Sequence, residues 1–291
     1  MNKVFILFLV SFLFIPFSVN AGGGWPQAKG EGFFLLSQRF IAANGYYNNQ
    51  GVIIGSPNLS AYTTHFYGEF GITDKITGIL HSPFVTALSR DAGVDGLGNV
   101  FNADQAVGFG DVDLGVKYNF ISKPFYLSAE LNLGINSGDY YGGSTESLHL
   151  GDGDFSQLLK VYASKGFKYG IFATLFGGIN NRTNGFSDEY HYGGELGIQQ
   201  FGFTAIVKTY SRQSFFNESR KDSQIPGIYS DNLEYFSYSF QLLYTYKDKF
   251  GLMIEQGTAS SSRNIIASKS FTFGVFYKLK KTVPKPEPAK P

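Results

Sequence analysis

Apolar and polar positions alternate along residues 108–120, which read GFGDVDLGVKYNF. The apolar set comprises Val112, Leu114, Val116, Tyr118 and Phe120, and the intervening set comprises Asp111, Asp113, Gly115, Lys117 and Asn119. A period of two places the two sets on opposite faces of a β-strand. The sequence therefore predicts a strand with one apolar face and one polar face.

The same alternation recurs in a series of stretches, most of them close to 11 residues long. Strands of soluble proteins average about 5–6 residues, whereas strands that cross an outer membrane need about 9–11. The predicted strands are residues 32–42, 61–71, 75–85, 108–120, 125–135, 154–166, 169–179, 189–199, 201–211, 233–246, 250–257 and 269–279. Pro83 makes residues 75–85 the least secure of them, because proline cannot donate to a β-ladder.

The connections between these strands alternate strictly in length. The short ones are residues 72–74, 121–124, 167–168, 200 and 247–249, and the long ones are 43–60, 86–107, 136–153, 180–188, 212–232 and 258–268. Bacterial outer-membrane barrels have an even number of strands, short periplasmic turns and longer outer loops. The sequence thus predicts an all-β fold, a transmembrane up-and-down antiparallel β-barrel of about 12 strands located in the cell outer membrane.

In such a barrel the apolar faces contact outer-membrane lipid and the polar faces line the lumen. The candidate lumen-lining residues are Arg39, His65, Glu69, Asp111, Asp113, Lys117, Glu130, Lys160, Glu195, Lys208 and Glu255. They include acids and bases, which could simply pair across a narrow interior or could line a permeation path. Because twelve strands lie between the filled eight-stranded barrels and the open sixteen-stranded ones, we expect a narrow lumen.

The first residues predict a secretory signal peptide over residues 1–21, with Lys3 before an apolar stretch and small residues at the cleavage site. The barrel domain would then cover residues 22–279. Residues 22–31, GGGWPQAKGE, are a candidate plug segment. Trp25 within it would either plug the lumen or, the interpretation we favour, anchor the chain at the periplasmic interface.

The last strand, SFTFGVFYKL, carries a pattern of polar residue, glycine, aromatic and hydrophobic residue at Thr272, Gly274, Tyr277 and Leu279. It resembles the signal by which the barrel-assembly machinery recognises outer-membrane proteins, so that machinery is an expected partner. Residues 280–291 alternate proline and lysine, which favours extended polyproline II. We expect them to form a disordered periplasmic tail.

Composition agrees with a β-rich chain and removes some function classes. The 291 residues include 30 Phe, 19 Tyr, 36 Gly and no cysteine, so burial or backbone pairing must hold the fold together without disulfides. A net charge of +1 argues against a nucleic-acid partner. Tyrosines near predicted strand ends are candidates for the aromatic girdles of the barrel: Tyr190, Tyr192, Tyr244, Tyr246 and Tyr277.

Catalytic and metal motifs are weak. The four histidines are His65, His81, His149 and His191, and none lies in the His-x-Ser-Asn-Gly arrangement of an outer-membrane phospholipase. A hydrolase that uses His81 or His191 is a remote alternative, so we expect no enzyme. Residues 151–155, GDGDF, lack the spacing and final glutamate of a calcium loop. No cofactor and no metal are therefore predicted.

Two segments resemble a known family, the outer-membrane proteins grouped with the MetA pathway of phenol degradation, which are similar to FadL-type channels. The matching residues are Gly110, Asp111, Gly115, Lys117 and Tyr118, followed by Gly151, Asp152, Gly153, Asp154, Phe155 and Gln157. The resemblance implies a barrel that transports small hydrophobic compounds. A shared barrel does not establish a shared substrate.

The expected function is a passive channel for small hydrophobic compounds, which would enter among outer-loop aromatics such as Phe215, Phe216 and Tyr229. Such a porin-like pore needs no energy source. The alternative is a non-transporting surface barrel whose long loops serve adhesion or polymer export, since loops rich in Asn, Ser, Gly and Tyr suit recognition equally well.

Overall fold

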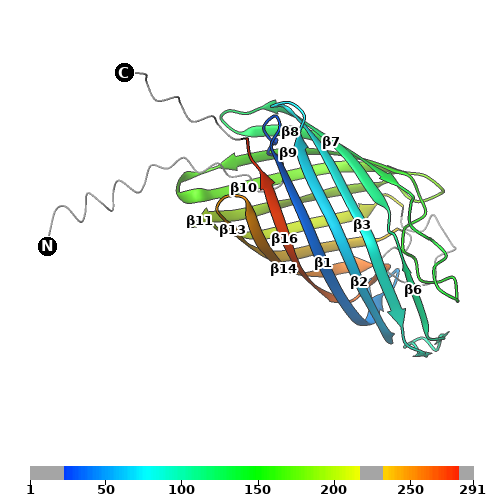
Figure 1. The fold of residues 1–291 in the computed structure, drawn as a ribbon. Coiled ribbons are helices and arrows are strands. Elements are labelled where there is room, and N and C mark those ends of the chain that lie inside the picture. Colours follow the sequence, from blue (N-terminus) through cyan, green and yellow to red (C-terminus); the bar gives the residue numbers. More distant parts are fainter. Residues whose placement is uncertain (1–22, 217–231, 282–291) are drawn as a thin grey trace, which may run out of the picture.

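The computed structural model describes residues 23–216 and 232–281, which form a closed antiparallel β-barrel of twelve long strands (Figure 1). The barrel strands are β1 (Gly32–Tyr47), β2 (Ile53–Gly71), β3 (Ile76–Arg90), β7 (Val112–Ile121), β8 (Tyr126–Ile135), β9 (Ser156–Gly166), β10 (Ile171–Arg182), β11 (Glu189–Gln200), β12 (Phe203–Ser214), β13 (Glu234–Tyr246), β14 (Phe250–Arg263) and β16 (Lys269–Leu279). Each strand pairs with its neighbours along this series, and β1 pairs with β16 to close the cylinder. The predicted fold class is confirmed.

Smaller elements extend this wall. The strand β6 (Asp104–Gly108) pairs with the outer part of β3, and β15 (Ile265–Ile266) pairs with the outer end of β1. A hairpin of β4 (Gly93–Val94) and β5 (Val100–Phe101) projects beyond them. At the opposite end, the 3₁₀ turn η1 (Lys168–Gly170) joins β9 to β10. The predicted signal peptide, the tail from residue 282 and Tyr229 lie outside the described residues.

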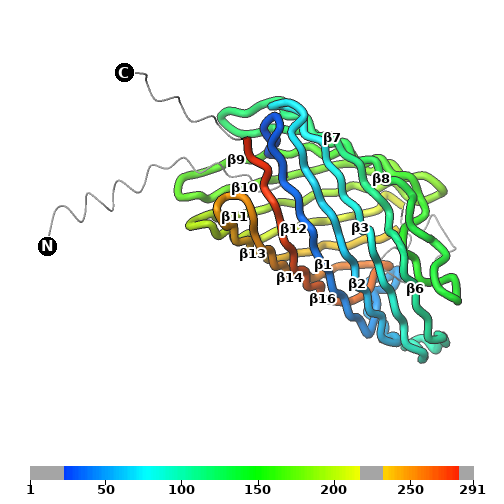
Figure 2. The backbone as a smooth tube through the Cα atoms, viewed as in Figure 1, coloured from blue at the N-terminus to red at the C-terminus, as the bar shows by residue number. Residues whose placement is uncertain are grey.

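The two ends of the barrel differ. The start of β1 and the end of β16 lie at the end that carries the short turns, and the long connections gather at the other end (Figure 2). In outer-membrane barrels the short turns are periplasmic and the long loops are external. The short-turn end is therefore called periplasmic below, and the other end is called outer.

Two of the predicted long loops are wrong in detail. Residues 43–60 form no long loop, because β1 and β2 stay paired up to Tyr47 and Ile53 around a tight turn. Similarly, β14 continues to Arg263, beyond the predicted end at residue 257. Above the lipid, side chains no longer need to alternate, so the sequence pattern fades while the backbone ladder continues. These extensions raise the barrel wall on its outer side.

Pro83 does not interrupt β3. The pairing of β3 with β2 passes from Thr64 opposite Val85 to His65 opposite Pro83, which leaves Phe84 as the extra residue of a β-bulge. On its other side, β3 pairs with β7 up to His81 and with β6 from Thr86. Pro83 thus lies where the ladder is already broken, as strand prolines usually do.

The exterior of the barrel is apolar. Leu175 and Leu252 expose 69% and 61% of their surface, whereas the charged Lys117 exposes only 1%. The girdle candidates Tyr190, Tyr192, Tyr244 and Tyr246 are also exposed. Such an inside-out distribution is unstable in water and matches the lipid-facing band of a membrane barrel. Among the described residues, no helix is both long and apolar enough to span a membrane.

Candidate functional site

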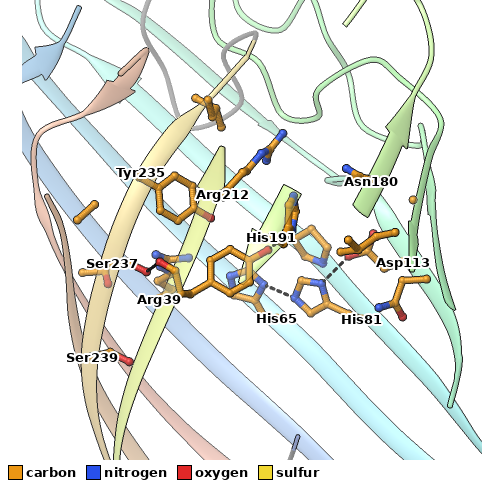
Figure 3. A pocket seen from close by; sticks show the side chains of 18 of the residues that line it. Arg39, His65, His81, Asp113, Asn180, His191, Arg212, Tyr235, Ser237 and Ser239 are labelled. Carbon is orange, nitrogen blue, oxygen red and sulfur yellow. Dashed lines mark hydrogen bonds and ion pairs between the residues drawn. The ribbon is translucent and has the colours of Figure 1, made fainter. Parts of the chain in front are cut away.

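The barrel interior contains a cavity of about 680 Å³, which we call the outer cavity. Its upper lining includes Leu233 and Ile266 at the outer strand ends. Lower down, side chains from opposite walls converge on it, with Arg39 and Tyr235 on one side and Asp113 on the other (Figure 3). The cavity is therefore a polar vestibule that leads inward from the outer end.

A second cavity of about 430 Å³, the inner cavity, extends toward the periplasmic end, where Phe33, Thr245 and Lys278 line it. The two cavities share a ring of lining residues, namely Gly23, Arg39, His65, Tyr67, His81, Glu255 and Ser270. Since each of these residues borders both spaces, the cavities adjoin at this ring. We call the ring the neck.

Residues 23–28, the strap, run through the lumen, and Gly23 at the start of the strap borders both cavities. Lys117 Nζ donates to the carbonyl oxygen of Gly23 at 2.6 Å, and Ser128 Oγ donates to that of Gly24 at 2.6 Å. A side chain at Gly24 would overlap Ser164 and Tyr162 of β9, so only glycine permits this close passage. Farther along, the backbone N–H of Gln27 donates to Thr77 Oγ1 at 2.9 Å.

Trp25 anchors the strap inside the barrel. Its ring is buried with Phe172 and Ile206, and it lies 4.4 Å from the ring centre of Tyr126. The favoured expectation of an anchor at the periplasmic interface is therefore wrong. Interface positions suit a tryptophan with one wet edge, whereas this side chain is only 8% exposed and lies within an apolar cluster of the lumen.

Ion pairs fill the wall next to the strap. Lys117 Nζ lies 3.2 Å from Glu69 Oε1 and 3.7 Å from Glu130 Oε2, and Lys160 Nζ lies 2.9 Å from Glu130 Oε1. Gln27 of the strap donates to the other oxygen of Glu69 at 2.8 Å. Because buried charges are stable only when paired and hydrogen-bonded, this network both balances the interior and holds the strap in place.

Two histidines form a chain at the neck (Figure 3). Asp113 Oδ2 lies 3.1 Å from Nδ1 of His81, and Nε2 of His81 lies 3.2 Å from Nδ1 of His65. Nearby, His191 contacts Glu189 through Nε2 and the Tyr210 hydroxyl through Nδ1. Among the described residues, no serine hydroxyl bonds to His81 or His191, which is the contact that a serine hydrolase would require.

A buried cluster ties the outer loops together. Arg182 is fully buried and donates to Asp154 at 2.8 and 3.0 Å, to Asp152 at 2.9 Å and to Glu189 at 3.1 Å. Arg212 adds a second cation on Glu189 at 2.6 Å. The carboxylates of GDGDF therefore bind an arginine. Within residues 23–216 and 232–281, no group of three or more His, Cys, Asp or Glu could hold a metal ion.

The structure places most of the predicted lumen residues at the two cavities. The outer cavity is bordered by Arg39, His65, Asp111, Asp113, Lys117, Glu130, Lys160 and Glu255, and the inner cavity also by Glu195 and Lys208. Glu69 borders neither and is buried against Lys117. Whether these residues act on a permeating solute stays a prediction.

Sequence reasoning missed several polar residues of the lumen. Tyr210 and Arg212 border the outer cavity, and they follow Lys208 at intervals of two on β12. Tyr67 likewise follows His65 on β2. The same period of two would have assigned the tyrosines to the lumen, but the lumen candidates were chosen among charged residues and histidine only. Arg212 fell in the predicted connection 212–232.

Asp111 joins the two segments that carry the family resemblance. Its carboxylate accepts from the backbone N–H groups of Ser137 at 3.1 Å, Gly138 at 2.8 Å and Asp152 at 2.7 Å. These bonds hold both ends of the long connection between β8 and β9, while Leu148 and Leu150 pack against the inner wall. Asp111 therefore holds both ends of this loop in place beside the barrel wall.

Replacing Asp111 with asparagine is expected to loosen this loop by about 1–3 kcal/mol, because hydrogen bonds to a charged acceptor are lost. Limited proteolysis of the detergent-solubilised protein would show faster cleavage within residues 136–155. Asp91→Asn is the matched control, since Asp91 is exposed and its side chain contacts Asn58. Equal cleavage rates for the wild type and Asp111→Asn would contradict the assignment.

No protein-family model matches the sequence, and a comparison with curated proteins found no match. Among solved structures, an outer-membrane channel from Pseudomonas putida F1 aligns with a TM-score of 0.62 at 14% identity, covering 90% of this chain and 100% of the channel. The KdgM porin aligns with a TM-score of 0.47 at 9% identity, covering 84% of this chain and 99% of the porin. A mutant of the monoaromatic hydrocarbon channel TodX gives 0.46 at 10% identity, covering 88% and 91%.

The likeness to the Pseudomonas channel shows the fold, and the lipid-facing exterior agrees with it. Membership of the family of the phenol-degradation pathway stays a prediction, because no family model matches. The protein is a porin-like β-barrel of the bacterial outer membrane. This follows from its apolar exterior, its closed ladder of strands and the sorting of short and long connections to opposite ends.

Proposed function

We propose that this barrel is a passive channel for small solutes. The observation that carries the proposal is the pair of adjoining cavities, which together reach from the outer strand ends to Lys278 near the periplasmic end. The strap leaves part of the lumen open, because both cavities extend beside it along the wall formed by β14, β16, β1 and β2. A solute would therefore pass the neck beside the strap.

The lining favours a small solute with a polar or charged group. At the neck, Arg39, His65 and Glu255 face the path, and tyrosine hydroxyls border the outer cavity. A wholly apolar molecule would have to displace water from these groups without replacing its hydrogen bonds. The expectation of a hydrophobic solute is supported by the aromatic rings of the cavity only, and it stays a prediction.

The proposal is tested by the conductance of the purified protein in planar lipid bilayers, where discrete single-channel steps are expected. A folded, inserted barrel that carries no current and admits no small sugar into vesicles would refute it. That result would favour the alternative of a sealed surface barrel used for adhesion or polymer export.

A bulky residue at the neck should narrow the path. Ser270→Trp is expected to reduce the conductance severalfold, since Ser270 borders both cavities. Ser268→Trp is the control, because Ser268 borders only the outer cavity near its rim. If both variants conduct like the wild type, the current does not pass the neck.

A further inference from the structure

Arg39 is a cation at the neck that forms no ion pair with a carboxylate in the described parts of the chain. It lies in the middle of β1 and borders both cavities, and among the described residues its guanidinium has neither a hydrogen bond nor an ion pair. The neighbouring cations are neutralised, since Lys208 pairs with Glu255 at 3.1 Å and Arg212 with Glu189 at 2.6 Å. A planar fork of N–H donors therefore faces the path unoccupied, and carboxylates fit such a fork in two-point contacts.

His65 offers a second unused group beside Arg39. In the β1–β2 pairing, Ser37 is opposite His65 and Arg39 is opposite Thr63, so the two side chains are diagonal neighbours on the inner face. Nε2 of His65 is buried and has no hydrogen-bond partner within the part of the chain that the structure describes. Buried polar atoms are nearly always paired in native proteins, so an orphan of this kind needs an explanation.

The hydrogen-bond chain determines whether this nitrogen donates or accepts. Because the carboxylate of Asp113 only accepts, Nδ1 of His81 carries a proton. If His81 is neutral, its Nε2 accepts from Nδ1–H of His65, and Nε2 of His65 holds a lone pair. If His81 is protonated, its Nε2–H donates to Nδ1 of His65, which moves the proton of His65 to Nε2. One added proton thus converts the orphan nitrogen from an acceptor into a donor.

We propose that the neck binds a small carboxylate through the Arg39 guanidinium and the Nε2–H of His65, and that protonation of His81 beside Asp113 switches this site on. The proposal rests on the proposed channel function and names its solute class. A monoanion fits better than a dianion, because Asp113 and Glu255 lie close by and would repel a second negative charge.

Other titratable and charged groups border the same cavity, and the pH dependence of the His81 switch must be distinguished from theirs. They are Tyr67 on β2, Asp111 just before β7, Lys117 on β7, Glu130 on β8, Asp152 and Asp154 just before β9, Lys160 and Tyr162 on β9, His191 on β11, Tyr210 and Arg212 on β12, Tyr235 and Tyr238 on β13, Glu255 on β14 and Lys269 on β16. His191 already uses both ring nitrogens. We therefore assign the pH dependence to His81, because it contacts Asp113. Variants of Asp113 and His65, its two hydrogen-bond partners, test this assignment.

Acetate is the probe, and binding is measured apart from conduction. In protein labelled with ¹⁵N-histidine in detergent micelles, acetate at pH 5.5 is expected to shift Nε2 of His65, one of four histidines. Arg39→Gln should weaken acetate binding about tenfold, the effect of losing a charged hydrogen bond. Lys269→Gln, which removes a cation of the outer cavity elsewhere, should leave the binding unchanged.

The switch is tested by the pH profile of acetate binding between pH 5 and 8. Binding should weaken as the pH rises, because without the added proton Nε2 of His65 holds a lone pair instead of a donor hydrogen. Asp113→Asn removes the carboxylate that accepts from Nδ1 of His81 and should reduce the pH step. His65→Gln should abolish the pH step. A step that persists in His65→Gln, or acetate binding that is unaffected in Arg39→Gln, would overturn the proposal.

The outcomes separate this inference from the proposed function. If acetate shifts the Nε2 signal of His65 but bilayers show no current, the carboxylate site is supported and the proposed channel function is refuted. If the protein conducts while acetate leaves the histidine signals unchanged at every pH, the channel stands and the carboxylate site is wrong.

Discussion

Replacing Trp25 with alanine is expected to raise the single-channel conductance severalfold. The indole ring is the apolar anchor of the strap against Phe172 and Ile206. Removing a buried tryptophan side chain costs about 3–5 kcal/mol of packing. The barrel wall keeps its complete backbone ladder, so the loss should fall on the strap, which then leaves its side of the lumen for part of the time.

Trp25→Phe is the matched control. Nε1 of Trp25 is buried and has no hydrogen-bond partner among the described residues, so a phenyl ring retains most of the packing and loses none of the observed bonds. Its conductance should stay near the wild-type value. Electrophoresis of unheated samples, in which both variants should migrate as the folded form, would verify that their barrels are intact. If folded Trp25→Ala protein conducts like the wild type, the strap does not restrict the path.

Replacing Arg182 with methionine is expected to destabilise the outer part of the barrel by about 3–5 kcal/mol, the range for breaking a buried ion pair. Arg182 is the cation that contacts Asp154, which is itself fully buried. Glu189 would retain Arg212, whereas Asp154 would retain no cation at ion-pair distance among residues 23–216 and 232–281. Urea unfolding in lipid vesicles would measure the loss.

The loss of stability in Arg182→Met should depend on pH, and the burial of Asp154 determines the direction. Burial raises the pKa of Asp154 to about 6, although its bonds to Arg182 act in the opposite sense. A carboxyl group whose pKa is higher in the folded state than in the unfolded state destabilises the fold as it ionises. The loss in Arg182→Met should therefore be larger at pH 7.5 than at pH 5.

Arg263→Met provides the comparison, because Arg263 forms a half-exposed pair with Glu234 at 3.4 Å. Exposed pairs contribute about 0–1 kcal/mol, so this variant should unfold almost like the wild type. Similar losses in the two variants, or a loss in Arg182→Met that does not vary with pH, would contradict the role given to the buried cluster.

The sequence was informative wherever the lipid and the lumen impose a period of two. Asp113, Lys117 and Glu130 could be assigned to the interior because each alternates with apolar neighbours that must face the bilayer. The same reasoning failed for Tyr67 and Tyr210, since a tyrosine suits a lipid interface and a wet lumen equally well. Beyond the membrane, the alternation fades, and the extensions of β1, β2 and β14 escaped prediction.

By itself, the sequence determined the barrel, its strand number and the polarity of its two faces, because the requirement to satisfy every backbone group in lipid acts on each strand locally. Only the tertiary structure decided where Trp25 lies and which acids Arg182 joins. It also decided that the Arg39 guanidinium and Nε2 of His65 have no hydrogen-bond partner among the described residues. Those features depend on residues far apart in the chain, such as Lys117 with Gly23, which meet only after the cylinder has closed. No local periodicity encodes such contacts, so the path and its neck could be found only in the folded chain.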